Sequence, residues 1–266
     1  ETFLEDTVDN YDNDRDRPAV HGTSYLSPHL HWGEISPFQV MHRAEEWLSE
    51  QSGGAIHEHI QSFQSEIGWR EFSRHVLYHF PETPDEPLDA RFKAFPWEAP
   101  DAAFDDWKAG MTGIPMVDAG MRELYATGYM HNRLRMTVAS FLTKNLRIAW
   151  QHGERWFWDT LFDADLGNNT LGWQWAAGCG ADAAPFFRIF NPARQGERFD
   201  KNGEYVRRWV PELAELSNKH LQEPWNAPDK ALEAAGVVLG KTYPKPVVDL
   251  KASRREALEA FEQVKN

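Results

Sequence analysis

The amino-acid sequence predicts a mainly α-helical protein, with one multi-helical domain and long connections between its helices. Apolar residues recur three and four positions apart along several segments, which is the spacing of the buried face of an α-helix. No segment alternates polar and apolar residues as a half-buried strand does, and the sequence contains no internal repeat. Residues 1–22 are acidic and predict an extended lead-in, and residues 23–266 predict a single helical domain.

The first helices are marked by residues that favour helix ends. Ser27-Pro28 and Ser36-Pro37 each place a hydroxyl at the expected N-cap and a proline at the first helical position. Gly53-Gly54 ends the second of these helices. A long helix is then expected from about Ala55 to Tyr78.

The remaining elements follow from prolines and apolar spacing. Five prolines in Pro81–Pro100 exclude regular structure in that segment. Helices are predicted over Pro115–Thr127 and over His131–Trp150, with shorter helices before and within Asp163–Pro192. A charged terminal helix is expected near Ala252–Val264.

Composition limits the classes of function. The net charge of −13 argues against a protein coated in positive charge for nucleic acid, although a local basic groove is compatible with it. Arginines that fall in the aromatic part of the chain include Arg133, Arg135, Arg147, Arg188, Arg194 and Arg198. The single Cys179 excludes a disulfide or a four-cysteine iron–sulfur cluster within the chain. No apolar run is long enough to span a bilayer and residues 1–16 do not resemble a signal peptide, so we expect no membrane partner and a reducing, cytoplasmic location.

Several short motifs have simpler explanations than function. Gly178–Ala183 matches a loose dinucleotide-binding fingerprint, but no strand is predicted before it. Asn168–Thr170 matches a glycosylation triplet, and nothing else suggests secretion. Histidines two positions apart do not share a helix face, so no metal site is predicted from the pairs His29/His31 and His57/His59.

The segment Asp163–Pro192 carries the strongest functional signal, because its first part brings together two aspartates, two adjacent asparagines and two tryptophans. Asn169 lies four residues before Trp173 and therefore on the same helical face. The aspartates need partners in an aromatic environment, and Arg133 and Arg135 could supply them. Together these groups would cradle a flat, redox-active cofactor; the alternative is that the tryptophans only fill the core.

A second group lies on one face of the long predicted helix. Glu66, Trp69 and Arg70 are spaced three and four residues apart. They could belong to the same site, or they could form a solvated ion pair beside a core tryptophan.

Four separated motifs resemble one known family. They are Thr23–Pro28 (TSYLSP), Glu66–Phe72 (EIGWREF), Gly128–Met136 (GYMHNRLRM) and Asp163–Pro192. In this order and spacing they are similar to the FAD-binding domain of class I cyclobutane pyrimidine dimer photolyases, within the photolyase/cryptochrome family. The similarity extends from about Tyr11 to Val248. Members normally carry an N-terminal α/β domain with an antenna pigment, which this sequence lacks, so an antenna pigment is expected only if that domain exists.

The resemblance implies a bent FAD at the centre of the helical domain, in the reduced anionic form for activity. The positions that match its binding residues are Tyr11, Thr23, Ser24, Tyr25, Leu26, Ser27, Phe63, Asn132, Arg135, Asp163, Ala164, Asp165 and Asn169. Asn169 matches the residue that faces flavin N5, where an amide is a poor proton donor; plant cryptochromes have Asp there. Two positions depart from the family, because Tyr25 stands where close relatives often have Arg and Tyr129 where Trp is common.

The resemblance also implies that the damaged bases are flipped out of DNA into a pocket above the flavin, a step for which photolyases are themselves a standard example. The matching DNA-binding residues are Arg15, Glu66, Trp69, Arg70, Asn132, Arg133, Met136, Trp175 and Gln195. Glu66 would hydrogen-bond the bases and stabilise charge that arrives on them. Trp173, Trp150 and Trp97 match a chain that passes electrons from the surface to the flavin. Glu66, Asn169 and these three tryptophans are the predicted catalytic residues.

The expected activity is that of a deoxyribodipyrimidine photo-lyase, a carbon–carbon lyase that uses light to split pyrimidine dimers in DNA, acting as a monomer. Asn132 and Met136 stand where photolyases for (6-4) lesions have histidines, so that substrate is not expected. The alternatives are a signalling cryptochrome, which would not need the lesion residues, and a helical interaction domain without cofactor.

Overall fold

The protein is mainly helical, and its computed structural model describes residues 1–51, 53–183 and 187–265. The α-helices are α1 (Thr2–Asp6), α2 (Tyr11–Asp14), α3 (Ser27–His31), α4 (Pro37–Ser49), α5 (Gly54–His79), α6 (Ala102–Ala109), α7 (Pro115–Thr127), α8 (Asn132–Ser140), α9 (Trp150–Thr160), α10 (Leu166–Ala177), α11 (Pro192–Phe199), α12 (Glu204–Trp209), α13 (Asn218–Leu221), α14 (Asp229–Ala234) and α15 (Leu250–Glu262). Shorter 3-10 helices are η1 (Val8–Asn10), η2 (Ala90–Ala94), η4 (Pro211–Leu213) and η5 (Pro224–Asn226), and η3 (Phe141–Asn145) is a π-helix. The predicted fold class is confirmed, since β-structure in the described residues is limited to two isolated bridges.

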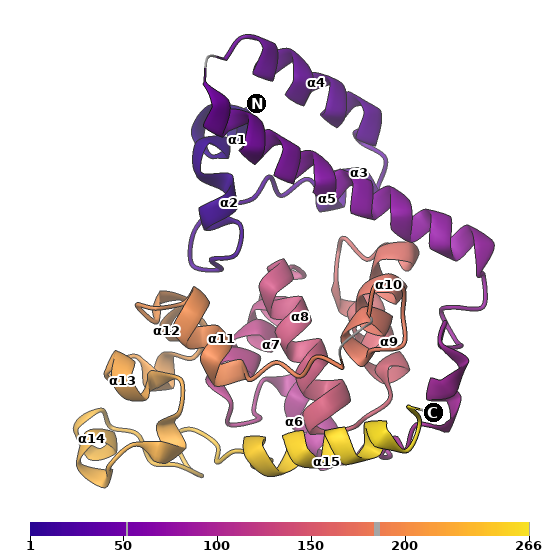
Figure 1. Ribbon diagram of the computed structural model, residues 1–266. Helices are drawn as coiled ribbons and strands as arrows, with labels where there is room; N and C mark the ends of the chain where they lie inside the picture. Colours follow the sequence, from indigo (N-terminus) through magenta and orange to yellow (C-terminus); the bar gives the residue numbers. More distant parts are fainter. Residues whose placement is uncertain (52, 184–186, 266) are drawn as a thin grey trace.

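Two hydrophobic clusters divide the molecule into an upper part and a lower part (Figure 1). The upper part contains α1 to α5, around a core that includes Leu4, Val40, Ile60 and Phe63. The lower part contains α6 to α15, around a larger core rich in aromatic side chains. Helix α5 joins the two parts because its C-terminal half packs against α10. No helix in the described part of the chain combines the length and hydrophobicity that crossing a bilayer requires.

The contact between α5 and α10 is close. A Cβ atom added at Gly167 would lie 3.2 Å from the backbone and side chain of Ser73, so glycine allows the two helices to approach. Ser73 Oγ also donates a hydrogen bond to Asn168 Oδ1 at 2.9 Å. This joint places the C-terminal half of α5 against the first turns of α10.

The predicted extended lead-in over residues 1–22 is wrong for residues 2–14, which form α1, η1 and α2. Leu4, Val8 and Tyr11 are buried in the upper core, and the Phe3 and Phe63 ring centroids lie 4.7 Å apart. These apolar residues are spaced three and four apart, as on a helical face, but the many acidic residues between them mask the pattern.

Two serines that were expected at N-caps behave differently. Ser36 caps α4 with a reciprocal capping box, in which its Oγ accepts from Gln39 N at 3.2 Å. Ser27 is not an N-cap; it is the first residue of α3, and its hydroxyl reaches across to Asp163. The prediction for Ser27 therefore fails because a tertiary partner uses the hydroxyl. The long helix predicted over residues 55–78 is confirmed as α5.

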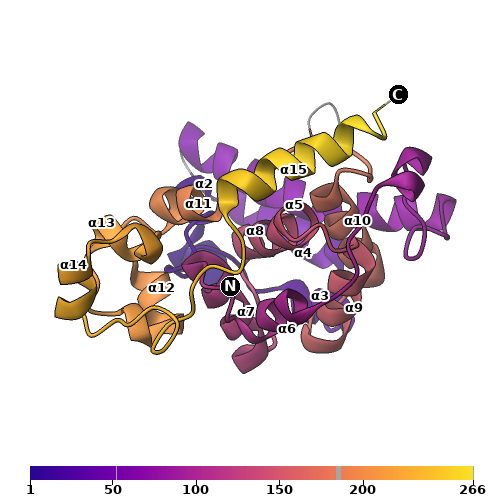
Figure 2. The ribbon, with the colours of Figure 1, turned by 90° about the horizontal axis from the view of Figure 1, so that it is seen from below.

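The single helix predicted over His131–Trp150 is interrupted. Helix α8 ends at Ser140 and continues as the π-helix η3, and α9 begins only at Trp150. Between them Arg147 has a positive φ of 53°, and its carbonyl accepts from Glu98 N at 2.8 Å. The apolar spacing is nearly continuous across the break, so periodicity alone could not locate it. Helix α15 packs against η3 and lies along the outer edge of the lower part (Figure 2).

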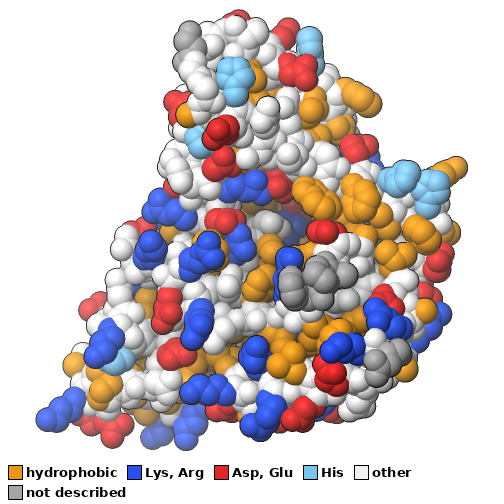
Figure 3. Space-filling view, in the orientation of Figure 1, with side chains coloured by type: hydrophobic (Ala, Val, Ile, Leu, Met, Phe, Trp, Pro, Cys, Tyr) orange, Lys and Arg blue, Asp and Glu red, His pale blue; other side chains and the backbone are white. Residues whose placement is uncertain are grey.

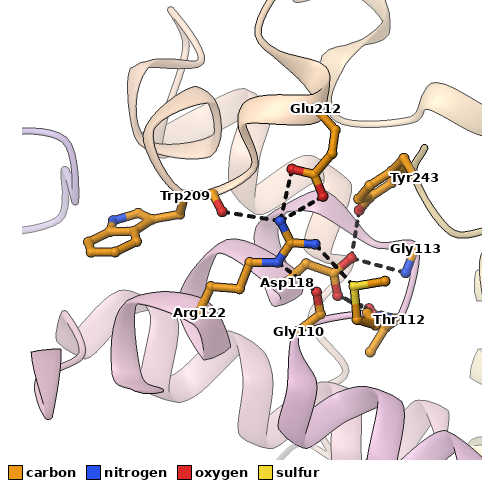
Figure 4. A network of polar contacts seen from close by, with 9 residues as sticks. Gly110, Thr112, Gly113, Asp118, Arg122, Trp209, Glu212 and Tyr243 are labelled. Atoms are coloured by element: carbon orange, nitrogen blue, oxygen red, sulfur yellow. Dashed lines mark hydrogen bonds and ion pairs between the residues drawn. The ribbon is translucent and has the colours of Figure 1, made fainter. Parts of the chain in front are cut away.

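A buried aspartate ties the C-terminal segments to α7 (Figure 4). The Asp118 carboxylate accepts hydrogen bonds from Thr112 N (2.7 Å), Thr112 Oγ1 (2.6 Å), Gly113 N (3.0 Å) and Tyr243 OH (2.6 Å). Burial raises the pKa of Asp118, although these donors oppose the shift. Gly113 has a φ of 75°, and a Cβ there would lie 2.5 Å from the Lys245 backbone. Only glycine therefore lets the two segments meet.

One helical turn further along α7, Arg122 makes a second set of contacts with the same C-terminal region (Figure 4). Its guanidinium donates to Gly110 O at 2.9 Å, to Trp209 O at 3.3 Å and to the Glu212 carboxylate at 3.0 Å. The polar segment after α11 is thus anchored by buried hydrogen bonds.

Replacing Tyr243 by Phe removes one donor from the buried Asp118 carboxylate and should lower the free energy of unfolding by about 1–2 kcal/mol. Urea unfolding at neutral pH measures the change. Tyr125→Phe is the matched control, because Tyr125 lies on α7, the helix that carries Asp118, and its side chain is 76% exposed. Equal stability of the two variants would contradict the role of this hydrogen bond.

Candidate functional site

The candidate site lies where α5, the loop before α3, α8 and α10 converge. Figure 3 shows that this face of the molecule is hollowed between the upper and lower parts, with Lys and Arg side chains beside the hollow. Most predicted site residues come from these four elements. The net negative charge of the chain is therefore compatible with a local positive surface here.

Asp163 and Arg135 form an ion pair, one of the pairings that the sequence left open. Arg135 Nη2 donates to Asp163 Oδ2 at 2.7 Å and to Oδ1 at 3.0 Å, and Arg135 Nε donates to Met130 O at 2.7 Å. Ser27 Oγ donates to Asp163 Oδ2 at 2.6 Å. The Asp163 side chain is 1% exposed and that of Arg135 is 26% exposed. The carboxylate is thus fully partnered, while part of the guanidinium remains open to a ligand.

Asp165 has different partners from those expected. It caps α10 by accepting from Asn168 N at 3.0 Å, and it pairs with Arg74 at 3.1 Å and Arg70 at 3.4 Å. Burial alone would raise the pKa of Asp165, but these hydrogen bonds and positive charges outweigh it and hold the pKa below its usual value. Arg133, the other expected partner, instead pairs with Asp16 at 2.5 Å.

The structure also corrects the prediction for Arg70. Its side chain is buried, and its Nη2 donates to Leu30 O at 3.0 Å in addition to pairing with Asp165. Arg70 therefore joins α5 to α3 and α10 and is not an exposed surface arginine. The sequence reasoning placed Arg70 on the same helix face as Glu66, but it did not anticipate that Arg70 lies under α3.

Asn169 is fixed by α9. Its Nδ2 donates to Glu154 O at 3.0 Å, so this hydrogen bond leaves the amide oxygen free to act as an acceptor. The next residue, Thr170, donates from Oγ1 to the Glu154 carboxylate. A Cβ at Gly153 would lie 2.1 Å from the Trp173 ring, so α9 and α10 touch directly at this glycine.

Glu154 is a site residue that the sequence analysis missed. It is 6% exposed, and burial raises the pKa of its carboxyl to about 7, partly opposed by the hydrogen bond from Thr170. The glycine before it was the available signal, because a glycine inside a tryptophan-rich helical pattern indicates close approach of another element.

The predicted tryptophans lie at different depths. Trp173 and Trp150 are buried, and Trp97 is half-buried with its ring 4.3 Å from that of Phe95. Trp173 contacts the rings of Phe157 at 4.9 Å and Trp107 at 6.1 Å. Trp107 was not singled out from the sequence. The electron-transfer chain through Trp173, Trp150 and Trp97 stays a prediction.

On the open side of the site, Glu66 pairs with Arg15, and both side chains are partly exposed. Trp69, 46% exposed, lies one helical turn from Glu66 and contacts Phe72 edge-to-face at 5.6 Å. Trp69 and Phe72 line a surface cavity of about 590 Å³ together with Ser65, Gly68 and Asp182. Two residues predicted to bind DNA, Arg15 and Glu66, therefore form an ion pair with each other. The third, Trp69, lines the surface cavity.

Helix α8 contributes three more predicted residues. Asn132 is exposed, with its Nδ2 3.8 Å from Met136 Sδ one turn along the helix, and Arg133 lies 4.3 Å above the Phe199 ring of α11. Gln195 of α11 is half-buried, and its Oε1 has no hydrogen-bond partner among the described residues. His131 starts α8 by accepting from Arg133 N at 3.1 Å, and burial lowers the pKa of this imidazole to about 4.

The remaining predicted cofactor residues lie between α2 and α3 or in the core. Tyr11 and Phe63 are both 4% exposed and contact each other at 5.9 Å, and burial raises the pKa of Tyr11 to about 12. Tyr25 has a positive φ of 54°, which is a strained conformation for a bulky residue, and its ring lies 5.1 Å from Tyr129. Three residues that are only partly exposed complete the loop: Thr23, Ser24 and Leu26. Ala164, between the two aspartates, is buried.

Comparison with known proteins places this geometry in a known context. A family model described as the FAD binding domain of DNA photolyase matches residues 63–263. The deoxyribodipyrimidine photo-lyase of Agrobacterium fabrum is 52% identical over 99% of this chain and 54% of that protein. Cryptochrome-1 of Arabidopsis thaliana is 43% identical over 99% of this chain and 39% of that protein.

Solved structures agree with these matches. A bacterial class III photolyase from Agrobacterium tumefaciens superposes with a TM-score of 0.94 and 51% identity, over 99% of this chain and 54% of that one. The chain thus spans about half the length, or less, of these relatives.

The buried Glu154 should make stability depend on pH. Its folded pKa lies above the unfolded value, so its contribution to stability is full below about pH 4.5 and is lost as the pH rises to 7. Glu154→Gln keeps an acceptor for Thr170 without the charge and should raise the free energy of unfolding at pH 8 by about 2–3 kcal/mol, with no gain near pH 4.5. Urea unfolding at both pH values measures this, with the exposed Glu58→Gln as control. A gain that is equal at the two pH values would argue against the ionisation of Glu154.

Proposed function

This chain belongs to the DNA photolyase family, and on that premise we propose that it binds FAD and repairs cyclobutane pyrimidine dimers in DNA with light. One observation carries the proposal. The fixed amide of Asn169 and the Arg135–Asp163 pair belong to α10, α8 and the residues just before α10, while Glu66 and the exposed Trp69 belong to α5, which packs against α10. A redox cofactor and a damaged base would need these two sets of groups.

The residues fit a flavin dinucleotide. The Asn169 amide oxygen, which the hydrogen bond to Glu154 leaves free, can accept a hydrogen bond from a ring N–H but has no proton to give. The partly exposed Arg135 guanidinium can stabilise negative charge at a ring edge, with Asp163 and Ser27 holding it in place. Thr23 Oγ1 is buried without a hydrogen-bond partner in the described part of the chain, as expected of a hydroxyl that serves a ligand.

When bound, reduced FAD would supply an electron to the lesion under light. The cofactor would be held by the predicted set: Tyr11, Thr23, Ser24, Tyr25, Leu26, Ser27, Phe63, Asn132, Arg135, Asp163, Ala164, Asp165 and Asn169. The groups of this site favour the reduced anionic form, because positive charge is present at Arg135 and the nearest amide is not an acid.

The DNA-facing residues would act by stacking, hydrogen bonding and charge. Trp69 offers an exposed aromatic surface for a flipped base, and Trp175 is half-buried at the far end of α10. Glu66, held by Arg15, would hydrogen-bond the base edges. Arg133 and Gln195 would contact the strand near phosphates, which positions the DNA without reading its sequence.

Signalling as a cryptochrome is the second candidate, favoured by the similarity to Cryptochrome-1. Repair is preferred because the proposed lesion side contains Glu66, Trp69, Asn132, Met136 and Trp175, which a signalling protein has no need to keep. The solved Agrobacterium relative is titled a class III photolyase, whereas the sequence motifs resemble those of class I. An antenna pigment would belong to a part of the protein outside this chain.

The proposal is tested by the absorption spectrum of the purified protein and by illumination with an oligothymidine that contains a dimer. Glu66→Ala should keep the flavin spectrum but lower repair per photon about tenfold or more, because a hydrogen bond to developing charge is lost. Glu71→Ala, an exposed acid on the same helix, is the control. A colourless protein, or one that repairs nothing, would overturn the proposal; wild-type yield in Glu66→Ala would remove only the role of that carboxylate.

Trp173→Phe should slow the photoreduction of oxidised FAD while repair by chemically reduced protein stays largely intact. The reason is that phenylalanine keeps the packing against Phe157 but is much harder to oxidise than an indole. Time-resolved absorption measures the rate, and Trp225→Phe, in η5 at the edge of the core, is the control. Equal photoreduction rates in Trp173→Phe and wild type would refute the electron-transfer role.

A further inference from the structure

Lys144 is a buried cation that the proposed function does not use. It lies on the π-helix η3 and is 1% exposed. Its Nζ donates to Ala176 O at 2.7 Å and, more weakly, to Arg188 O at 3.4 Å, and it lies 3.9 Å above the centre of the Phe187 ring. One ammonium group thus touches the last turn of α10 and the segment that leads into α11.

Ser140, one turn before Lys144, holds the same segment. Its Oγ accepts a hydrogen bond from Phe190 N at 3.1 Å, and the serine is 1% exposed. The backbone of residues 187–190 is therefore bound at two points, by an amine and a hydroxyl from consecutive turns.

This segment covers one side of Trp175. The Arg188 guanidinium lies 5.5 Å from the Trp175 ring centroid, and the Phe190 ring centroid lies 6.2 Å from it. Arg188 is exposed and Trp175 is half-buried. The segment thus sets both the orientation of this indole and the place of a surface positive charge beside it.

A buried ammonium needs a reason, because removing its charge from water is costly. The carbonyl of Ala176 lies at the C-terminal end of α10, where the helix dipole favours a cation. That contact alone would account for Lys144 only as a C-terminal cap of α10. The additional contacts with Phe187 and Arg188, and the parallel hydrogen bond from Phe190 to Ser140, extend the role to residues 187–190.

We propose that Lys144 and Ser140 are positioning residues for the lesion pocket, because they hold residues 187–190 and thereby keep Arg188 and Phe190 against Trp175. The inference rests on the proposed function in that Trp175 is taken to border a damaged base. Neither residue contacts DNA or cofactor directly. Both act through residues 187–190, which they hold in place.

The experiment compares Lys144→Met with Asn145→Leu. Asn145 is the next residue of the same π-helix, and its buried amide donates to Ser253 Oγ of α15 at 2.8 Å, so it holds a different element. Hydrogen exchange at residues 187–190 and binding of dimer-containing and undamaged oligothymidine are measured for both. Lys144→Met should speed exchange at 187–190 and weaken dimer binding about tenfold. Asn145→Leu should do neither, and the flavin spectrum should be unchanged in both.

Equal dimer affinity in Lys144→Met and Asn145→Leu would overturn the proposal. Ser140→Ala removes only the acceptor for Phe190 N, so it provides the test if Lys144→Met does not fold; dimer binding and exchange equal to wild type would then overturn it. A wild-type protein that binds neither oligonucleotide would overturn the proposed function instead. In that case the exchange rates alone would support or refute the hold of Lys144 on residues 187–190.

Discussion

The position of helix α10 depends on polar contacts at both of its ends and along its length. The candidate site depends in turn on the position of α10. Asp165 caps its first turn and pairs with two arginines of α5, and the backbone carbonyl of Glu154 holds Asn169. At its other end Lys144 donates a hydrogen bond to the carbonyl of Ala176. Each of these groups costs free energy to bury unless its partner is in place. The orientation of the helix is therefore sharply determined.

The sequence predicted the fold class and most helices, because apolar spacing and capping residues are local signals. It also named Arg133 and Arg135 as possible partners of the two aspartates, and Arg135 does pair with Asp163, whereas Arg133 pairs with Asp16. It failed where a distant segment decides the outcome. Ser27 donates to Asp163 instead of capping its helix, and Arg70 lies buried under α3. No spacing within one helix contains that information.

Several of the residues missed from the sequence are buried polar groups. Lys144 and Asp118 have no distinctive neighbours in sequence, and Glu154 has only the adjacent Gly153; their importance appears when other elements enclose them. Burial raises the pKa of Glu154 to about 7 and lowers that of Lys144 to about 7. Helix α9 and the π-helix η3, which both contact α10, thus carry groups whose charge changes near neutral pH.

Because the molecule contains two hydrophobic clusters, its stability should differ between the ligand-free and the ligand-bound protein. The α5–α10 joint and the contacts of Ser27 and Arg70 connect the clusters largely through polar groups. A molecule bound in the hollow between the two parts would contact both of them. Its binding free energy would therefore stabilise their association. Loss of such a molecule would loosen the upper part first, and the chain would then melt as two bodies instead of one.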